Sequence, residues 1–269
     1  MIAINYIGQC GFVIFDDRIS FAIDPVLNDL VGEDGKSIRN YPPVISCEEL
    51  NADYVFCTHD HIDHMAKETL LEVAKVDEET KFVVPAGCVK ELISWGIEGS
   101  RVLGIAAGET KTLTVNGNDG EGNPRKPGKL KVKAISTAHP VHQVDEEGLD
   151  HNLAYCIELE DKKLVHLGDT YMTEQLEKDL RSLGHVDVLF PPINGRDEER
   201  ESQGIIGNLS CEEAANLADR LRADLTIPTH FDMVAGNTAD PFDFAQRLWD
   251  LNQENKCWIP TLREQFVVM

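Results

Sequence analysis

Apolar and polar residues alternate in short segments along the first part of the chain. Runs of β-branched and aromatic residues are separated by glycine or polar residues, a pattern typical of strands joined by tight turns. We therefore expect hairpin-connected strands at Ala3–Ile7, Gly11–Phe15 and Ile19–Ile23. The dipeptide Asp24-Pro25 ends the third of these strands.

Farther along, apolar segments of strand length alternate with segments of helical period. Two of the helices are expected to open on a capping box, a serine followed three residues later by glutamate. The expected strands are Tyr54–Cys57, Phe82–Pro85, Val102–Ala106, Leu113–Val115, Leu130–Ile135, Leu153–Leu159, Lys163–Leu167, Val186–Phe190 and Leu225–Pro228. The expected helices are a short one opened by Ser46–Glu49, Lys67–Val76, Val89–Trp95, Glu174–Ser182, one from Ser210 through Arg222, and one from Asp240-Pro241 through Leu251. This order predicts an α/β (α+β) protein whose β-sheets are covered by helices.

Asn116–Lys129 breaks the pattern, because it is rich in glycine, asparagine and proline. Such a composition predicts a loop. Strands are expected on both sides of it, so we interpret it as a surface insertion and not as a linker between domains. A chain of 269 residues then fits one large domain, residues 1–269.

Composition narrows the classes of partner. The chain has 47 acidic and 25 basic residues, a net charge of −22. Nucleic-acid binding depends on Lys and Arg and a membrane-surface protein needs a basic face, so neither nucleic acid nor membrane is expected as a partner. The seven cysteines, with no Cys-x-x-Cys pair, indicate free thiols in a reducing compartment. We see no signal-peptide pattern at Met1–Tyr6 and no apolar run of about 20 residues, and therefore expect a cytoplasmic protein.

The strongest chemical signal is the run His59-Asp60-His61-Ile62-Asp63-His64, which directly follows a predicted strand. Imidazole and carboxylate groups are good ligands for zinc and neighbouring divalent metals. His59 and His61 alternate along an extended backbone and so point the same way, whereas Asp63 and His64 are placed to reach a second position. One loop is therefore expected to serve two metals.

Two metals need more ligands than this loop supplies. His139, Asp169 and His230 each come at the end of a predicted strand. Side chains at the carboxyl ends of neighbouring strands meet at one edge of a sheet. Asp169 has two oxygens that can bridge two metals, and Gly168 before it allows a close approach of the backbone.

The chain resembles the metallo-β-lactamase superfamily in these motifs, and within it the L-ascorbate-6-phosphate lactonase family. The resemblance covers nearly the whole chain, with the motifs in the same order. The stretches that carry it are Ile7–Phe12, Thr58–His64, Thr137–His139, His166–Thr170, Pro192–Asp197 and Ile227–Met233.

The resemblance implies a four-layer αββα sandwich, the metallo-β-lactamase fold, with a site for two Zn²⁺ or Mn²⁺ ions at one edge. It implies that His59, His61 and His139 hold the first metal, that Asp63, His64 and His230 hold the second, and that Asp169 bridges them. It also implies hydrolysis of a lactone of a small anionic, phosphorylated sugar acid. Asp63 is then either a general base that takes a proton from the nucleophile or a metal ligand alone.

Substrate contacts are expected in the stretch Asn194-Gly195-Arg196-Asp197 and at Arg200. An arginine fork suits a phosphate or carboxylate group of a substrate. The alternative is that Arg196 and Arg200 form salt bridges with the acidic residues around them.

Other residues have two interpretations. Asp24 is either a turn residue or a group that supports the metal ligands from behind. His139 is preferred to His142 as the ligand, since the family pattern places it after alanine. His151 and His166 are expected in strands and His185 on the surface.

Other functions remain open. The same site could cleave a phosphodiester. The chain could also be a metal-binding module without activity. A di-iron protein that handles oxygen or nitric oxide is a third alternative, but it would need a redox partner domain. The resemblance also suggests a homo-oligomer.

Overall fold

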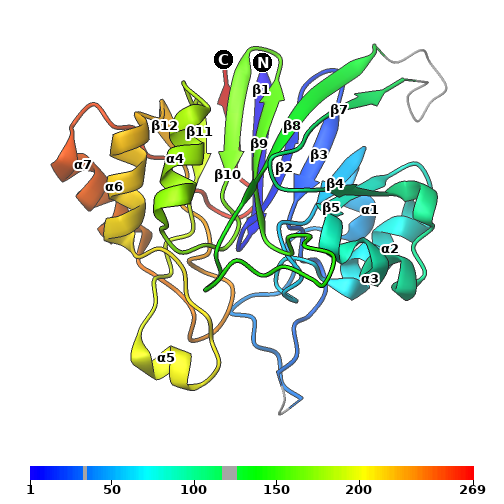
Figure 1. Ribbon diagram of the computed structural model, residues 1–269, viewed down its shortest axis with the longest axis horizontal. Coiled ribbons are helices and arrows are strands. Elements are labelled where there is room, and N and C mark those ends of the chain that lie inside the picture. Colours follow the sequence, from blue (N-terminus) through cyan, green and yellow to red (C-terminus); the bar gives the residue numbers. More distant parts are fainter. Residues whose placement is uncertain (33–34, 117–125) are drawn as a thin grey trace.

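The computed structural model describes residues 1–32, 35–116 and 126–269. Two β-sheets pack face to face, and helices cover the outer face of each (Figure 1). This is the mixed α/β class that the sequence predicts, and its four layers are the expected αββα sandwich.

The first sheet has the strand order β13-β1-β2-β3-β4-β5-β6. Its first four strands pair antiparallel and the remaining ones pair parallel. The strands are β1 (Ile2–Gly8), β2 (Gly11–Phe15), β3 (Ser20–Ile23), β4 (Tyr54–Phe56), β5 (Lys81–Pro85), β6 (Val102–Ile105) and β13 (Gln265–Val268).

The second sheet has the order β12-β11-β10-β9-β8-β7. Strands β10, β11 and β12 are parallel, and the others are antiparallel to their neighbours. The strands are β7 (Thr110–Val115), β8 (Gly128–Ser136), β9 (Leu153–Leu159), β10 (Lys162–His166), β11 (Val188–Phe190) and β12 (Leu225–Thr226).

The helices form the outer layers. Buried side chains of α1, α2 and α3 pack on the first sheet, and those of α4, α6 and α7 pack on the second. The helices are α1 (Cys47–Leu50), α2 (Lys67–Val76), α3 (Val89–Trp95), α4 (Glu174–Ser182), α5 (Glu198–Ser202), α6 (Cys211–Leu221) and α7 (Pro241–Leu251). Both predicted capping boxes are present, at Ser46 and Ser210.

The core lies between the two sheets. Phe12 on β2 meets Phe190 on β11 with ring centroids 4.8 Å apart, and Phe56 on β4 meets Tyr155 on β9 at 5.5 Å. These side chains are fully buried, and burying an aromatic or aliphatic side chain contributes about 1.5–3 kcal/mol. The packed core fixes the ends of the strands and thereby the loops that follow them.

Several boundaries differ from those expected. Strand β11 begins at Val188 and not at Val186, and β12 ends at Thr226 and not at Pro228. Strand β8 begins at Gly128, inside the predicted loop Asn116–Lys129, because Gly128 pairs with Val115; residues 117–125 of that loop lie outside the described residues. Helix α5 and strand β13 were not predicted, since their sequences have no strong period.

Candidate metal centre

The His-rich run forms a tight loop after β4. The backbone N–H groups of His64 and Met65 both donate to the carbonyl oxygen of His61, at 3.0 and 2.8 Å. This turn holds the ring of His59 against that of His61, with Nε2 of His59 and Nδ1 of His61 3.0 Å apart.

Two further residues join these rings from the second sheet. His139 follows β8 and Asp169 follows β10, and both are buried. His59, His61, His139 and Asp169 each offer a ligand atom, and these four atoms lie within 4.8 Å of one another. A single divalent cation would therefore be within reach of all four.

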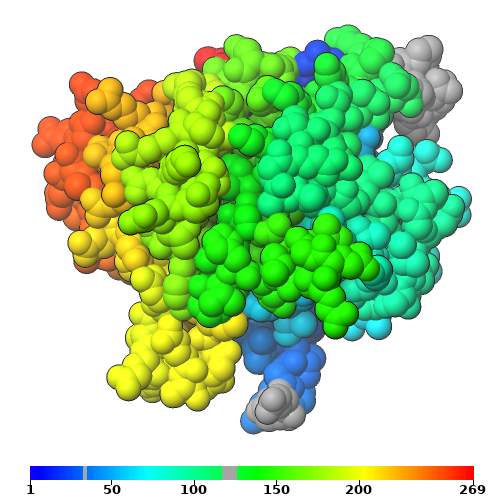
Figure 2. All heavy atoms as spheres, in the orientation of Figure 1, coloured from blue at the N-terminus to red at the C-terminus, as the bar shows by residue number. Residues whose placement is uncertain are grey.

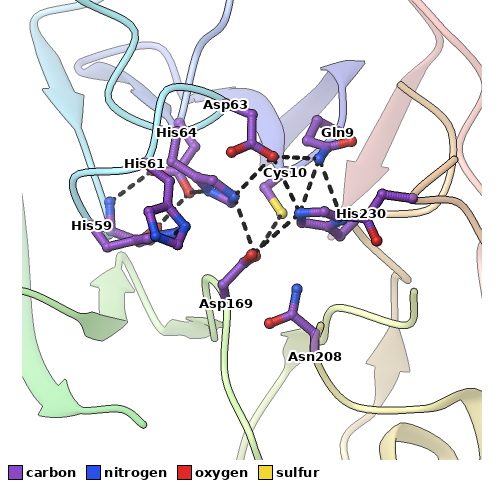
Figure 3. Close-up of polar contacts among 12 residues, drawn as sticks. Gln9, Cys10, His59, His61, Asp63, His64, Asp169, Asn208 and His230 are labelled. Atoms are coloured by element: carbon purple, nitrogen blue, oxygen red, sulfur yellow. Dashed lines mark hydrogen bonds and ion pairs between the residues drawn. The ribbon is translucent and has the colours of Figure 1, made fainter. Parts of the chain in front are cut away.

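A second group lies beside the first. Asp63, His64 and His230 also bring their ligand atoms within 4.8 Å of one another. Nε2 of His230 lies 3.3 Å from Oδ2 of Asp63, and Nε2 of His64 lies 3.7 Å from the same oxygen. The structure thus brings together all seven residues predicted as metal ligands, in the two predicted groups. Figure 3 labels all of them except His139.

Asp169 lies between the two groups. Its Oδ1 is 3.2 Å from Nε2 of His64, while its Oδ2 is 3.2 Å from Nε2 of His230 and 3.5 Å from Nε2 of His139. Gly168 before it has φ +58°, and a Cβ there would lie 2.7 Å from the Thr58 side chain. Glycine is therefore required for this approach of β10 to the His-rich loop.

Asp24 supports the site from behind. It follows β3, is fully buried, and its Oδ2 lies 2.7 Å from Nδ1 of His64. The same carboxylate accepts hydrogen bonds from the backbone N–H and the hydroxyl of Thr58, both at 2.7 Å. A carboxylate on the far nitrogen fixes the orientation and the tautomer of a metal-binding histidine. Of the two interpretations of Asp24, the geometry therefore favours the supporting one.

Gln9 is a neighbour of the site that sequence reasoning missed. Its Nε2 donates to Oδ2 of Asp63 at 2.8 Å and lies 2.9 Å from Nε2 of His230. Gln9 is fully buried, and its backbone has φ +58°. The available signal was the sequence Gly8-Gln9 at a strand end, where a turn brings the next side chain to the same edge.

The site has distinct pKa shifts. Burial lowers the pKa of His59 well below its usual value and lowers that of His139 to about 4. Burial alone would also lower the pKa of His230, but Asp169 and Asp63 outweigh it and raise that pKa to about 9. In the same way the nearby carboxylates raise the pKa of His64. In the metal-free chain His59 and His139 are therefore neutral, whereas His64 and His230 carry protons.

These charges fit a divalent cation. The carboxylates of Asp24, Asp63 and Asp169 are gathered in one mostly buried place, and buried charges need compensation. Protons on His64 and His230 provide it in the metal-free chain, and metal ions would provide it once those protons leave. Nitrogen and oxygen ligands of this kind suit zinc, manganese and iron alike.

The predicted substrate contacts lie in another setting. Arg196 makes a two-pronged ion pair with Glu213, at 2.7 and 2.8 Å, and its guanidinium stacks over Tyr171. Arg200 pairs with Asp197 and donates to the carbonyl oxygen of Asn194 at 2.9 Å.

Asn194 itself is buried. It exchanges amide hydrogen bonds with Asn208 and Asn237 at 3.0 and 2.9 Å. All three residues predicted as substrate contacts thus bind groups of the chain itself. For Arg196 and Arg200, these ion pairs are the alternative that the sequence left open. A substrate contact by any of the three stays a prediction.

The remaining histidines are spread over the fold. His166 lies in β10 and His185 is exposed, as expected. His151 was expected in a strand but precedes β9, where its Nδ1 lies 2.9 Å from Oδ2 of Asp60. His142 contacts Ser136 and is exposed.

A hollow of about 400 Å³ opens over the metal centre. Asp60, His61, Asp63, Asp169 and His230 line its floor. Its walls come from Ile62 in the ligand run and from three other segments, and they consist mainly of aliphatic side chains: Ile38, Ile62, Ile205, Ile206 and Val234, together with Gly204 and Asn237. This volume is typical of a small-molecule site.

No helix in residues 1–32, 35–116 and 126–269 is long and apolar enough to cross a membrane.

Comparison with known proteins agrees with this fold and site. The chain is 29% identical to a UPF0173 protein from Pyrococcus abyssi over 94% of this chain and 96% of that protein. It is 24% identical to a UPF0173 metal-dependent hydrolase from Archaeoglobus fulgidus, over 90% of this chain and 88% of that one. Its fold matches that of Igni18, a metallo hydrolase from Ignicoccus hospitalis, with a TM-score of 0.70, 20% identity and coverage of 100% and 99%.

Residues 20–231, which hold all seven predicted metal ligands, match the family model of the β-lactamase superfamily domain. The chain therefore belongs to the metallo-β-lactamase superfamily and is similar to its UPF0173 metal-dependent hydrolases.

Proposed function

We propose that the chain is a hydrolase with two divalent metal ions per molecule, and that it cleaves carboxylic esters, including lactones. One observation carries this proposal: the Asp169 carboxylate contacts two groups of ligand atoms, His139 of the first and His64 and His230 of the second. A hollow above them gives a small molecule access to both groups.

The two donor sets support one division of the ligands between the metals. His59, His61 and His139 would hold the first ion, Asp63, His64 and His230 the second, and Asp169 both. When bound, such ions lower the pKa of water to about 7 and stabilise negative charge on a carbonyl oxygen.

The chain's own residues transfer the proton of the attacking water and orient the groups that take part. Asp63 lies on the floor of the hollow and remains partly exposed, so it can accept a proton from the attacking water. It can then return that proton to the alkoxide that leaves when the ester or lactone bond breaks. The Gln9 amide donates to Oδ2 of Asp63, which orients the carboxylate while leaving Oδ1 for this task. Asp24 holds His64 in the tautomer whose Nε2 faces the metals.

The narrower prediction is a lactone of a phosphorylated sugar acid. It rests on the resemblance of the stretches at Asn194–Asp197 and His230–Met233 to the lactonase family. For Arg196 or Arg200 to hold the phosphate, each would have to leave its ion pair with Glu213 or Asp197. Phosphodiester cleavage is the competing reaction for the same ligand set.

The test combines metal content with hydrolysis. The protein is purified without added metal, metal per chain is measured after incubation with Zn²⁺ or Mn²⁺, and p-nitrophenyl acetate, L-ascorbate 6-phosphate and bis(p-nitrophenyl) phosphate are assayed. We expect about two metals per chain and ester hydrolysis that His61→Ala abolishes. His185→Ala, an exposed histidine away from the site, is the matched control and should hydrolyse as the wild type does. Activity that survives His61→Ala would overturn the proposal.

A further inference from the structure

The walls of the hollow are apolar, although its floor is highly polar. Five aliphatic side chains line them: Ile38, Ile62, Ile205, Ile206 and Val234. Ile62 stands in the middle of the ligand run and is 59% exposed. Large aliphatic side chains that converge on a concave site from distant parts of a chain are typical of ligand contact.

One wall is formed by two segments that pair with each other. The segment with Ile38 lies against the segment with Val234, since Arg39 pairs with Val234 and the N–H of Ala235 donates to the carbonyl oxygen of Ile38 at 2.8 Å. Arg39 fixes its own segment further by donating to the carbonyl oxygens of Val26, Asn28 and Tyr41, each at 3.0 Å.

The opposite wall follows helix α5. The N–H of Ile205 donates to the carbonyl oxygen of Arg200 at 3.0 Å, and Arg200 is itself joined to Asn194 and Asn237. Arg200, one of the two arginines predicted as phosphate contacts, therefore secures the loop that carries Ile205 and Ile206. Figure 2 shows the blue residues 28–32 and 35–40 and the yellow residues 198–206 projecting side by side from the lower edge, with a notch between them.

The charges that line the hollow also favour an apolar ligand group. The ionisable residues that line the hollow are Asp60, Asp63, Asp169 and two histidines, and its described lining includes no lysine or arginine. Away from the metals, a phosphate group on the substrate would therefore meet carboxylates and aliphatic side chains. An alkyl or aryl group would instead cover the exposed Ile62 and exclude water from the walls.

We propose that the hollow binds an uncharged alkyl or aryl substituent of the substrate beside the scissile bond, so that the substrate class is apolar esters or lactones and not phosphorylated sugar acids. This inference rests on the proposed hydrolase function, since that function places the reacting carbonyl on the floor of the hollow.

Binding can test it without turnover. Alkyl hydroxamates bind metals through their head group and differ only in chain length, so the dissociation constants of aceto-, butyro-, hexano- and octanohydroxamate are measured by calorimetry on the metal-loaded protein. Each buried methylene contributes about 0.8 kcal/mol, which corresponds to about fourfold tighter binding. Partial contact with an open hollow leads us to expect at least tenfold from aceto- to hexanohydroxamate.

Variants locate the effect. Ile62→Ser and Ile206→Ser should flatten the dependence on chain length, while Ile93→Ser, an isoleucine on α3 that is 45% exposed and does not line the hollow, should leave it unchanged. Three results would overturn the inference. These are equal dissociation constants across the series, no binding of octanohydroxamate, and competition for the site by L-ascorbate 6-phosphate that is tighter than competition by octanohydroxamate.

The outcomes separate the two proposals. Hydrolysis of p-nitrophenyl acetate with a flat hydroxamate series would keep the hydrolase and reject the apolar substituent. A steep series with no ester hydrolysed would keep the apolar site and reject the reaction.

Discussion

Replacing Asp24 by asparagine should weaken the second metal position through a change of histidine tautomer. In the wild type, the carboxylate of Asp24 accepts the Nδ1 proton of His64 at 2.7 Å, which leaves Nε2 to face Asp63 and Asp169. Asparagine can still accept the N–H of Thr58 through its oxygen, but its amide nitrogen then faces His64. Two donors cannot pair, so the proton of His64 moves to Nε2, the atom that would bind the metal.

Loss of such a supporting contact typically lowers metal affinity by about 10- to 100-fold, the equivalent of about 1.4 to 2.7 kcal/mol. We therefore expect Asp24→Asn to weaken the second metal by that factor and to leave the first, held by His59, His61 and His139, nearly unchanged. Titration against a chromophoric chelator separates the two affinities. Asp53→Asn is the control, because that carboxylate also accepts a backbone N–H and a hydroxyl, both from Ser20, at 2.7 and 3.0 Å, but away from the site. Unchanged second-site affinity in Asp24→Asn would refute the tautomer argument.

Three further predictions concern His230, Asp169 and Ser210. The pKa of His230 is raised to about 9 from a usual 6.5. Protonation of His230 therefore stabilises the metal-free fold fully below pH 6.5, and this contribution, at most about 3 kcal/mol, is lost as pH rises through 9. The Tm should fall over that range in the presence of a chelator, whereas with metal present it should rise with pH, because metal binding releases the protons. Asp169→Asn should reduce metal content below two per chain and hydrolysis to background, measured by elemental analysis and ester assay, and two retained metals would exclude the bridging role. Ser210→Ala removes the cap of α6, in which the hydroxyl accepts from the N–H of Glu213, and should cost about 1 kcal/mol, seen as a Tm lower by about 2 °C.

The sequence was most informative where local pattern and chemistry coincide. The His-rich run could be identified because six consecutive positions hold its ligands directly after a strand. The capping boxes at Ser46 and Ser210 likewise depend on residues three apart, and both helices begin where expected. Strand β13 was missed because Gln265–Val268 has alternate half-buried residues at a sheet edge and gains its order from pairing with β1, far away in the chain.

Contacts behind the ligands were harder to predict for the same reason. Asp24 and His64 are 40 positions apart, and Gln9 and His230 are 221 apart, so no local spacing relates them. The arginines show the opposite difficulty. Arg196 and Arg200 have the chemistry of anion contacts, but Glu213 and Asp197 already satisfy them, and only the folded chain shows which acidic group each one meets.

Backbone conformation connects these observations. Gln9, Asp24 and His230 all have φ between +45° and +58°, and each follows a strand that ends at the site. The left-handed region is unfavourable for residues other than glycine, at a cost of about 1–3 kcal/mol each. Such strain persists only where the surrounding packing enforces it, and here the buried strands on both sides do so. All three side chains reach the metal centre: Gln9 contacts Asp63, Asp24 contacts His64, and His230 contacts Asp169. Positive φ also occurs at Asn51 and Arg222, which end helices, and at Glu160 in the turn between β9 and β10. At Gln9, Asp24 and His230 it instead accompanies side chains that meet around the metal centre, so the strain at these three positions agrees with a functional role for this edge.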